Sequence, residues 1–344
     1  MTDGRPLPSP TGTSLTEVSA CPYCASGDLV IAYTGVRDHF HVSDAAWSYV
    51  RCRDCGSLLL SPRPSAGGLA ALYPERYTGT PGEGRSSGLL QAAIVAAERV
   101  FFSLQYRTQR KVVVEGTPVP ATPTPTAVLD VGCGNGRRLL QFHDLGMDVR
   151  GVDFRAELSH DVRRAGLTVL ECDVERLNDV VPAESIDIVT AFYVLEHADR
   201  VGRMISACRA VLRPGGWLAA AVPLAASCQE IRFGARWSQI VEAPRHTTLP
   251  SVRGLTRLLT DIGFTDISVV PESALLRGAM LALSVVPESE ASLVSSDSAP
   301  RRLLRRALAG AALGPGVAYA LAEDRLWGRP SAAIVLAQKA PATP

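Results

Sequence analysis

The chain has no surplus of either charge and almost no lysine. Its 35 Lys and Arg residues face 34 Asp and Glu residues, which gives a formal net charge of +1 at pH 7. Proteins that bind nucleic acid usually carry a basic patch or stripe, and the basic residues here form no long run. A nucleic-acid partner is therefore not expected. Lys111 and Lys339 are the only lysines, which indicates a compositional bias rather than a function.

Long apolar runs are absent as well. The two longest stretches without charge, Pro214 to Gln229 and Ala307 to Ala322, have 16 residues each and contain Gly and Pro. A membrane-spanning helix needs about 18 or more apolar residues, so stable membrane insertion is not expected. Met1 to Ala20 is rich in Pro, Gly, Ser and Thr and lacks the apolar segment of a secretory signal. We expect a cytoplasmic protein in which residues 1–20 are disordered.

A glycine loop between a buried strand and a helix is the strongest feature that is present. Thr126 to Val131 is mostly apolar and β-branched, as is typical of a buried parallel strand. Gly132, Gly134 and Gly136 follow at every second position, where the missing Cβ atoms let the backbone approach a ligand closely. Apolar spacing in Arg137 to Leu145 predicts a helix. Strand, glycine loop and helix N-terminus together are typical of nucleotide-type cofactor sites.

The spacing favours one class of cofactor. The dinucleotide fingerprint Gly-x-Gly-x-x-Gly would place its third glycine where this chain has Arg137. Asp130 precedes the loop by two residues, and its carboxylate would repel a pyrophosphate but attract an ammonium or a sulfonium group. Asp130-x-Gly132-x-Gly134-x-Gly136 resembles motif I of the class I S-adenosylmethionine (SAM)-dependent methyltransferases.

Later segments follow in the order of the same family. Further strands are predicted at residues 148–152, 167–170, 185–192, 217–222, 265–270 and 332–336. Leu195-Glu196-His197 stands just after the strand at 185–192, where many small-molecule members of the family have a similar tripeptide. The resemblance implies an α/β fold: a Rossmann-like, seven-stranded, mostly parallel sheet with flanking helices.

The resemblance also implies a set of SAM contacts. Asp130 would lie near the methionine ammonium group and Asp173 would accept from the adenine amine. Asp153 ends the second strand, where an acid suits the ribose hydroxyls of a nucleotide-type cofactor. The residues expected to bind SAM are Asp130, Gly132, Cys133, Gly134, Gly136, Asp153, Phe154, Asp173, Val174 and Tyr193.

Two Cys-x-x-Cys pairs predict a zinc-ribbon-like module near the N-terminus. The expected metal ligands are Cys21, Cys24, Cys52 and Cys55. Four thiolates on two tight turns can surround Zn²⁺ tetrahedrally. Free or redox-active thiols are an alternative, and disulfides are another, although a reducing cytosol disfavours them. His39 and His41 lie in the spacer and could replace a cysteine as ligand, but four sulfurs already complete a structural site.

The remaining segments suggest a domain order. A helix is predicted over Leu89 to Gln109, with an apolar stripe that packs on the catalytic domain. Residues 78–87 are expected to be mobile. We predict four regions: a disordered segment 1–20, the zinc-ribbon-like module 21–62, a helical linker region 63–125, and a SAM-dependent methyltransferase domain 126–344 with a helical insert at 271–329.

Two histidines are candidate general bases because imidazole titrates near neutral pH. His246 lies in the long loop Leu224 to Pro250, which we expect to contact substrate; His197 could equally make a structural hydrogen bond. The expected reaction is methyl transfer from SAM to a small-molecule acceptor in a biosynthetic pathway, at hydroxyl oxygen or else at carbon or nitrogen. A methyltransferase acting on ribosomal RNA or another nucleic acid, and a non-catalytic SAM- and zinc-binding interaction protein, are the alternatives. The sequence leaves the oligomeric state open.

Overall fold

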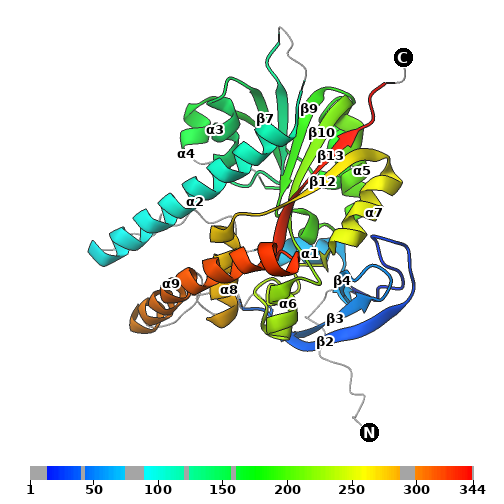
Figure 1. Cartoon of the computed structure of the whole chain (residues 1–344). Coiled ribbons are helices and arrows are strands. Elements are labelled where there is room, and N and C mark those ends of the chain that lie inside the picture. Colours follow the sequence, from blue (N-terminus) through cyan, green and yellow to red (C-terminus); the bar gives the residue numbers. More distant parts are fainter. Residues whose placement is uncertain are drawn as a thin grey trace.

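A seven-stranded sheet forms the centre of the protein (Figure 1). The computed structural model describes residues 14–39, 43–73, 89–119, 124–155, 160–286 and 299–342. The strand order is β12-β13-β10-β9-β6-β7-β8. The strands are β6 (Ala127–Val131), β7 (Asp148–Asp153), β8 (Thr168–Glu171), β9 (Ile186–Phe192), β10 (Leu212–Pro223), β12 (Phe264–Pro271) and β13 (Ala332–Lys339).

All neighbouring pairs from β8 to β10 are parallel, whereas β13 pairs antiparallel with both β10 and β12. One strand of the seven is therefore reversed, and the predicted Rossmann-like, mostly parallel sheet is confirmed. Its carboxyl ends bring the segments after β6, β7 and β9 to one edge, which is where open α/β sheets bind ligands.

Helices cover both faces of the sheet. Side chains of β6 alternate between them: Val128 packs in one buried cluster with Leu139 and Phe142, and Leu129 packs in a second cluster with Ile205. The flanking helices are α3 (Arg137–His143), α4 (His160–Arg164), α5 (Val201–Val211) and α7 (Val252–Ile262). This alternation follows from the period of two in a strand, and because both faces are covered the central strands are apolar throughout.

A second, four-stranded sheet is built from the N-terminal module and one later segment. Its order is β11-β4-β3-β2, with all pairs antiparallel. The strands are β2 (Leu29–Arg37), β3 (Ala46–Cys52), β4 (Leu58–Leu60) and β11 (Thr248–Leu249). In Figure 1 the strands β2, β3 and β4 lie below the large sheet, in blue, with α7 above them.

The expected disorder of residues 1–20 is wrong for the described part of that segment. β1 (Leu15–Thr16) pairs antiparallel with β5 (Arg63–Pro64), and the Val18 amide donates to the hydroxyl of Ser61. Residues 15–16 are therefore ordered by backbone pairing with a later segment, although their composition suggested disorder. Residues 1–13 lie outside the described residues, as do residues 78–87.

Within the residues that the structure describes, two helices precede the large sheet: α1 (Ala66–Ala71) and α2 (Leu89–Gly116). α2 runs beyond the predicted end at residue 109, and two residues of its predicted apolar stripe, Val100 and Leu104, are exposed. Its buried side chains include Gln105, Gln109 and Val113. α2 thus packs partly through polar side chains, and a pattern of apolar residues in the sequence does not predict such a face.

The insert between β12 and β13 is helical where it is described, as predicted. It contains α8 (Ala274–Val285), α9 (Ala299–Ala322) and the short π-helical turn η6 (Glu323–Trp327). α8 and α9 lie side by side in the lower part of Figure 1. Among the described residues, none of the helices combines the length and apolar character needed to cross a membrane.

Gly278 of α8 lets α9 approach its backbone closely. A Cβ atom added at Gly278 would lie 2.6 Å from the amide nitrogen of Val317, whereas one at Gly310 meets nothing within 4 Å. We expect Gly278→Ala to lower the free energy of unfolding by ~1–3 kcal/mol through overpacking. Gly310→Ala, the matched control on the exposed side of α9, should raise it by ~0.5–1 kcal/mol. Urea unfolding measures both changes, and equal effects would contradict the packing argument.

Candidate active site

The glycine loop follows β6 and has three residues in the left-handed region. Gly132, Gly134 and Gly136 have φ values of +68°, +54° and +77°, a conformation that strains residues with a Cβ atom. A Cβ at Gly132 would also lie 2.4 Å from Cγ2 of Val194. The loop is thus bare backbone at the carboxyl edge of the sheet, with α3 beginning at Arg137 directly after it.

Asp153 ties this loop to the end of β7. Its Oδ2 accepts from the Gly134 amide at 2.8 Å and its Oδ1 from the Arg155 amide at 3.0 Å. Burial raises the pKa of this carboxyl, and the backbone hydrogen bonds work in the opposite direction. The neighbouring Phe154 is exposed and its ring lies 5.4 Å from that of Tyr73.

Asp130 and Asp173, the other two acids expected at SAM, differ in their surroundings. Asp130 is fully buried; its Oδ1 accepts from Thr190 at 2.7 Å, and its Oδ2 lies 4.0 Å from Arg138. Burial raises its pKa while Arg138 lowers it. Asp173 is exposed and caps the 3-10 helix η1 (Val174–Asp179), accepting from the Glu175 amide at 2.9 Å.

The segment after β9 carries strained backbone and a buried acid. Tyr193 has a φ of +60°, which is uncommon for a bulky residue and typical of functional sites. The 3-10 helix η2 (Leu195–His197) follows. Glu196 is 1% exposed, and neither of its carboxylate oxygens has a hydrogen-bond partner within the described residues. Burial raises the pKa of Glu196 to about 8.

The two candidate histidines lie against each other. The ring centroids of His197 and His246 are 4.6 Å apart. His246 places Nδ1 2.7 Å from the Gln239 carbonyl and Nε2 3.5 Å from Glu242. His197 places Nδ1 2.9 Å from the Tyr73 hydroxyl. Burial lowers the pKa of both imidazoles to about 3, so both are neutral at pH 7.

Side chains of the N-terminal module hold the segment around His246. Both carboxylate oxygens of Asp38 accept from Arg245, at 2.8 and 3.0 Å, and both side chains are fully buried. The Tyr49 hydroxyl donates to the His246 carbonyl at 2.7 Å. The segment 224–250 is therefore largely interior, and it contains the helix α6 (Cys228–Phe233) and β11 instead of forming one long loop as predicted. Sequence reasoning missed Asp38, Tyr49 and Tyr73, because none of them belongs to a motif that the sequence shows.

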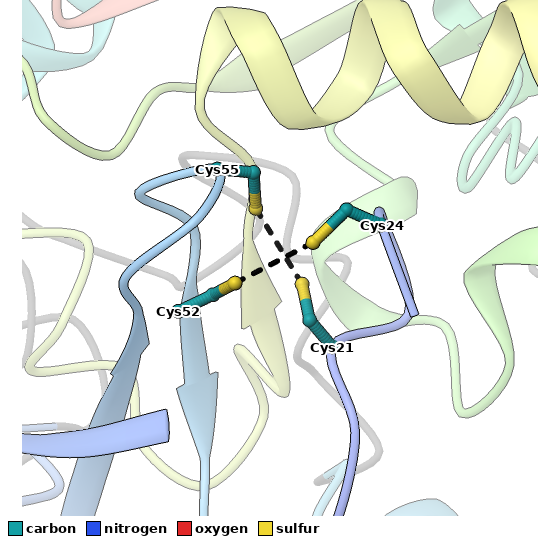
Figure 2. A group of neighbouring side chains, drawn as sticks. All are labelled: Cys21, Cys24, Cys52 and Cys55. Atoms are coloured by element: carbon teal, nitrogen blue, oxygen red, sulfur yellow. Dashed lines mark hydrogen bonds between the residues drawn. The ribbon is translucent and has the colours of Figure 1, made fainter. Parts of the chain in front are cut away.

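The four predicted cysteine ligands converge in the interior of the module (Figure 2). Sγ of Cys21 lies 3.5 Å from Sγ of Cys55, and Sγ of Cys24 lies 3.4 Å from Sγ of Cys52. All four sulfurs lie within 4.8 Å of one another. These distances exceed the ~2.05 Å of a disulfide bond and approach the spacing around a tetrahedral ion with ~2.3 Å metal–sulfur bonds.

The hydrogen bond between Cys21 and Cys55 lowers the pKa of the Cys55 thiol. His39 belongs to neither group of metal-ligating side chains found in the described part of the chain; His41 lies outside that part.

Comparison with known proteins matches residues 105–269 to the family described as a methyltransferase domain. The match covers 165 of the 344 residues, just under half of the chain. The ubiquinone biosynthesis O-methyltransferase of Paraburkholderia phymatum is 35% identical over 102 residues, which cover 28% of this chain and 43% of that protein. Its counterpart in Bordetella avium is 38% identical over 99 residues, 26% of this chain and 40% of that protein.

The chain thus spans about two fifths of the length of the curated relatives it matches. Among solved structures, a SAM-dependent methyltransferase from Archaeoglobus fulgidus is 19% identical, covers 69% of this chain and 94% of its own, and has a TM-score of 0.43. That likeness is too distant to indicate a function. The glycine loop and η2 both lie within the matched methyltransferase domain, whereas the four cysteines precede it.

Proposed function

We propose that this protein transfers the methyl group of SAM to a small-molecule acceptor, at hydroxyl oxygen. The observation that carries the proposal is one sheet edge, in a methyltransferase domain, that bears both the glycine loop and the Glu196–His197–His246 cluster. The matched relatives are named as O-methyltransferases, which supports oxygen as the acceptor atom; carbon and nitrogen are the alternatives. The small net charge of +1 supports a small acceptor over a polyanion.

The chain's own residues fit SAM. The left-handed glycine loop offers backbone without Cβ atoms, and we assign its residues, with Cys133, to the methionine part. We assign Asp153, each of whose oxygens accepts one backbone hydrogen bond and keeps a further lone pair, to ribose together with Phe154, and Asp173 with Val174 to adenine. We assign the buried Asp130, which pairs with Arg138, to the positively charged methionine part of SAM. Tyr193 is assigned to the methyl group. When bound, SAM supplies the reactive sulfonium methyl, so the protein needs mainly alignment and a proton acceptor.

Asp153→Ala is expected to weaken SAM binding at least ten-fold. Charge-assisted hydrogen bonds contribute ~1.5–3 kcal/mol each, and ~1.4 kcal/mol corresponds to a factor of ten. Calorimetric titration with SAM measures the change, with Asp148→Ala as control because Asp148 begins the same strand and is half exposed. Unchanged affinity in Asp153→Ala, or NAD binding more tightly than SAM, would refute the assignment.

We further propose that Cys21, Cys24, Cys52 and Cys55 bind one structural Zn²⁺. Four thiolates close the coordination shell and leave no open position for chemistry. Protein purified without chelator should contain this zinc, and the double variant Cys52→Ser, Cys55→Ser should lose one equivalent together with stability, because structural zinc contributes folding free energy. Metal analysis and thermal unfolding test this, with Cys172→Ser as control. Wild-type protein that is folded and free of zinc would disprove the site.

The proposed function is tested by incubating the protein with methyl-labelled SAM and either a metabolite extract or total RNA. We expect label in the metabolite fraction and none in RNA. Label in RNA, with binding that weakens steeply as salt rises, would replace the small-molecule acceptor by a nucleic acid. Label in neither fraction would favour the non-catalytic alternative.

A further inference from the structure

Three potential metal ligands meet at the carboxyl edge of the sheet, apart from the cysteine cluster. Glu196, His197 and His246 each offer one ligand atom, and these atoms lie within 4.8 Å of one another. The first two come from η2 and the third from the segment just before β11. Because the N-terminal module holds that segment through Asp38 and Tyr49, the folded chain positions all three.

Glu196 supplies an independent indication that something binds here. It is 1% exposed, yet both carboxylate oxygens are without a hydrogen-bond partner in the described part of the chain. Leaving a buried carboxyl unpartnered is costly, so buried acids normally have a hydrogen-bond partner, an ion partner or a metal. The guanidinium of the nearby Arg245 forms its ion pair with Asp38.

Both imidazoles are oriented as metal ligands usually are. Nδ1 of His246 lies 2.7 Å from the Gln239 carbonyl, and Nδ1 of His197 lies 3.2 Å from the Arg245 carbonyl and 2.9 Å from the Tyr73 hydroxyl. A ligating histidine commonly gives its second ring nitrogen to a backbone carbonyl, which fixes the ring and directs the other nitrogen to the metal. Glu242, 3.5 Å from Nε2 of His246, lies next to the same position.

We propose that Glu196, His197 and His246 bind a divalent transition-metal cation whose open positions coordinate an oxygen of the methyl acceptor. Two imidazoles and one carboxylate suit Zn²⁺, Co²⁺, Mn²⁺ or Fe²⁺ rather than Mg²⁺ or Ca²⁺, which prefer oxygen ligands. The role in acceptor binding rests on the proposed function. In the metal-bound protein the two histidines are ligands, and the proton of the acceptor hydroxyl, whose pKa the cation lowers, passes to water rather than to either imidazole.

The test uses Co²⁺ as the probe with the full chain, after removal of bound metal under reducing conditions. Wild-type protein should bind two Co²⁺ per chain, one with the sulfur-to-cobalt charge-transfer band of thiolate ligands and one without it. Glu196→Gln, which keeps the side-chain shape, and His246→Asn should lose the second ion or bind it at least ten-fold more weakly. The double variant Cys52→Ser, Cys55→Ser should lose the thiolate-bound ion and its charge-transfer band while it keeps the other ion.

A wild-type protein that binds a single Co²⁺ would overturn the inference, and so would a second Co²⁺ that binds Glu196→Gln and wild type equally. Circular dichroism ensures that the variants compared are folded. The outcome is separate from that of the proposed function: methyl transfer that proceeds in protein with a single, thiolate-bound metal refutes only this site. A second, Glu196-dependent ion in a protein that methylates no small molecule refutes only the methyltransferase proposal.

Discussion

His246→Ala is expected to lower turnover at least 100-fold while leaving the affinity for SAM intact. General-base assistance contributes ~10²–10⁴-fold, and loss of a ligand to an acceptor-binding metal would have an effect of similar size. The neutral imidazole of His246 lies beside His197, next to η2 at the carboxyl end of β9. Single-turnover kinetics with saturating SAM, combined with calorimetry, separates turnover from binding.

A purely structural role of His246 needs its own control, because the ring is buried and bonded to the Gln239 carbonyl. Asn can keep a donor near the Nδ1 position while lacking any equivalent of Nε2. His246→Asn should therefore be as inactive as His246→Ala but more stable. Restored turnover in the Asn variant would mean that the histidine acts only through its structural hydrogen bond.

His197→Ala distinguishes the two histidines, and His143→Ala serves as a neutral control because His143 is at the exposed end of α3. If His246 is the base, removing His197 should have the smaller effect. A large loss only in His197→Ala would transfer the role to His197. Comparable losses in both variants are the pattern expected of two ligands to one metal.

Local patterns were sufficient to predict the large sheet and its loop. Apolar runs located all seven strands, and the Gly-x-Gly-x-Gly spacing located a loop whose backbone requires glycine. Ser251 caps α7 through its side chain and Gly263 ends that helix in the left-handed region. These signals depend on residues a few positions apart, and so they can be read without knowledge of the tertiary structure.

Contacts between distant segments were not predictable in the same way. β11 is only two residues long and pairs with β4, almost 190 positions earlier, so it carries no pattern of its own. The Asp38–Arg245 ion pair joins residues 207 positions apart. An isolated Asp or Arg reads as a surface residue in sequence, since charged residues are rarely buried unless they are paired. The sequence of the N-terminal module therefore gave no indication that Asp38 and Tyr49 contact the segment around His246.

Asp38→Ala is expected to reduce the free energy of unfolding by ~3–5 kcal/mol, the usual cost of removing one partner of a buried ion pair. The guanidinium of Arg245 would be left in an interior where its side chain is fully buried. Turnover should fall together with stability, because Arg245 precedes His246 and its carbonyl lies near Nδ1 of His197. Urea unfolding and steady-state kinetics measure the two effects.

The double variant Asp38→Ala, Arg245→Met separates charge from position. Removing the stranded charge should restore part of the stability lost in Asp38→Ala, because well-packed apolar residues often replace a buried pair at little cost. Turnover should stay low, because the segment that carries His246 has lost its ion pair with Asp38, the residue directly after β2. Asp28→Ala, which breaks an exposed pair with Arg53, should change stability by less than ~1 kcal/mol. Arg245→Met alone completes the comparison. If the losses of unfolding free energy in the two single variants sum to the loss in the double variant, Asp38 and Arg245 do not couple the N-terminal module to the candidate active site.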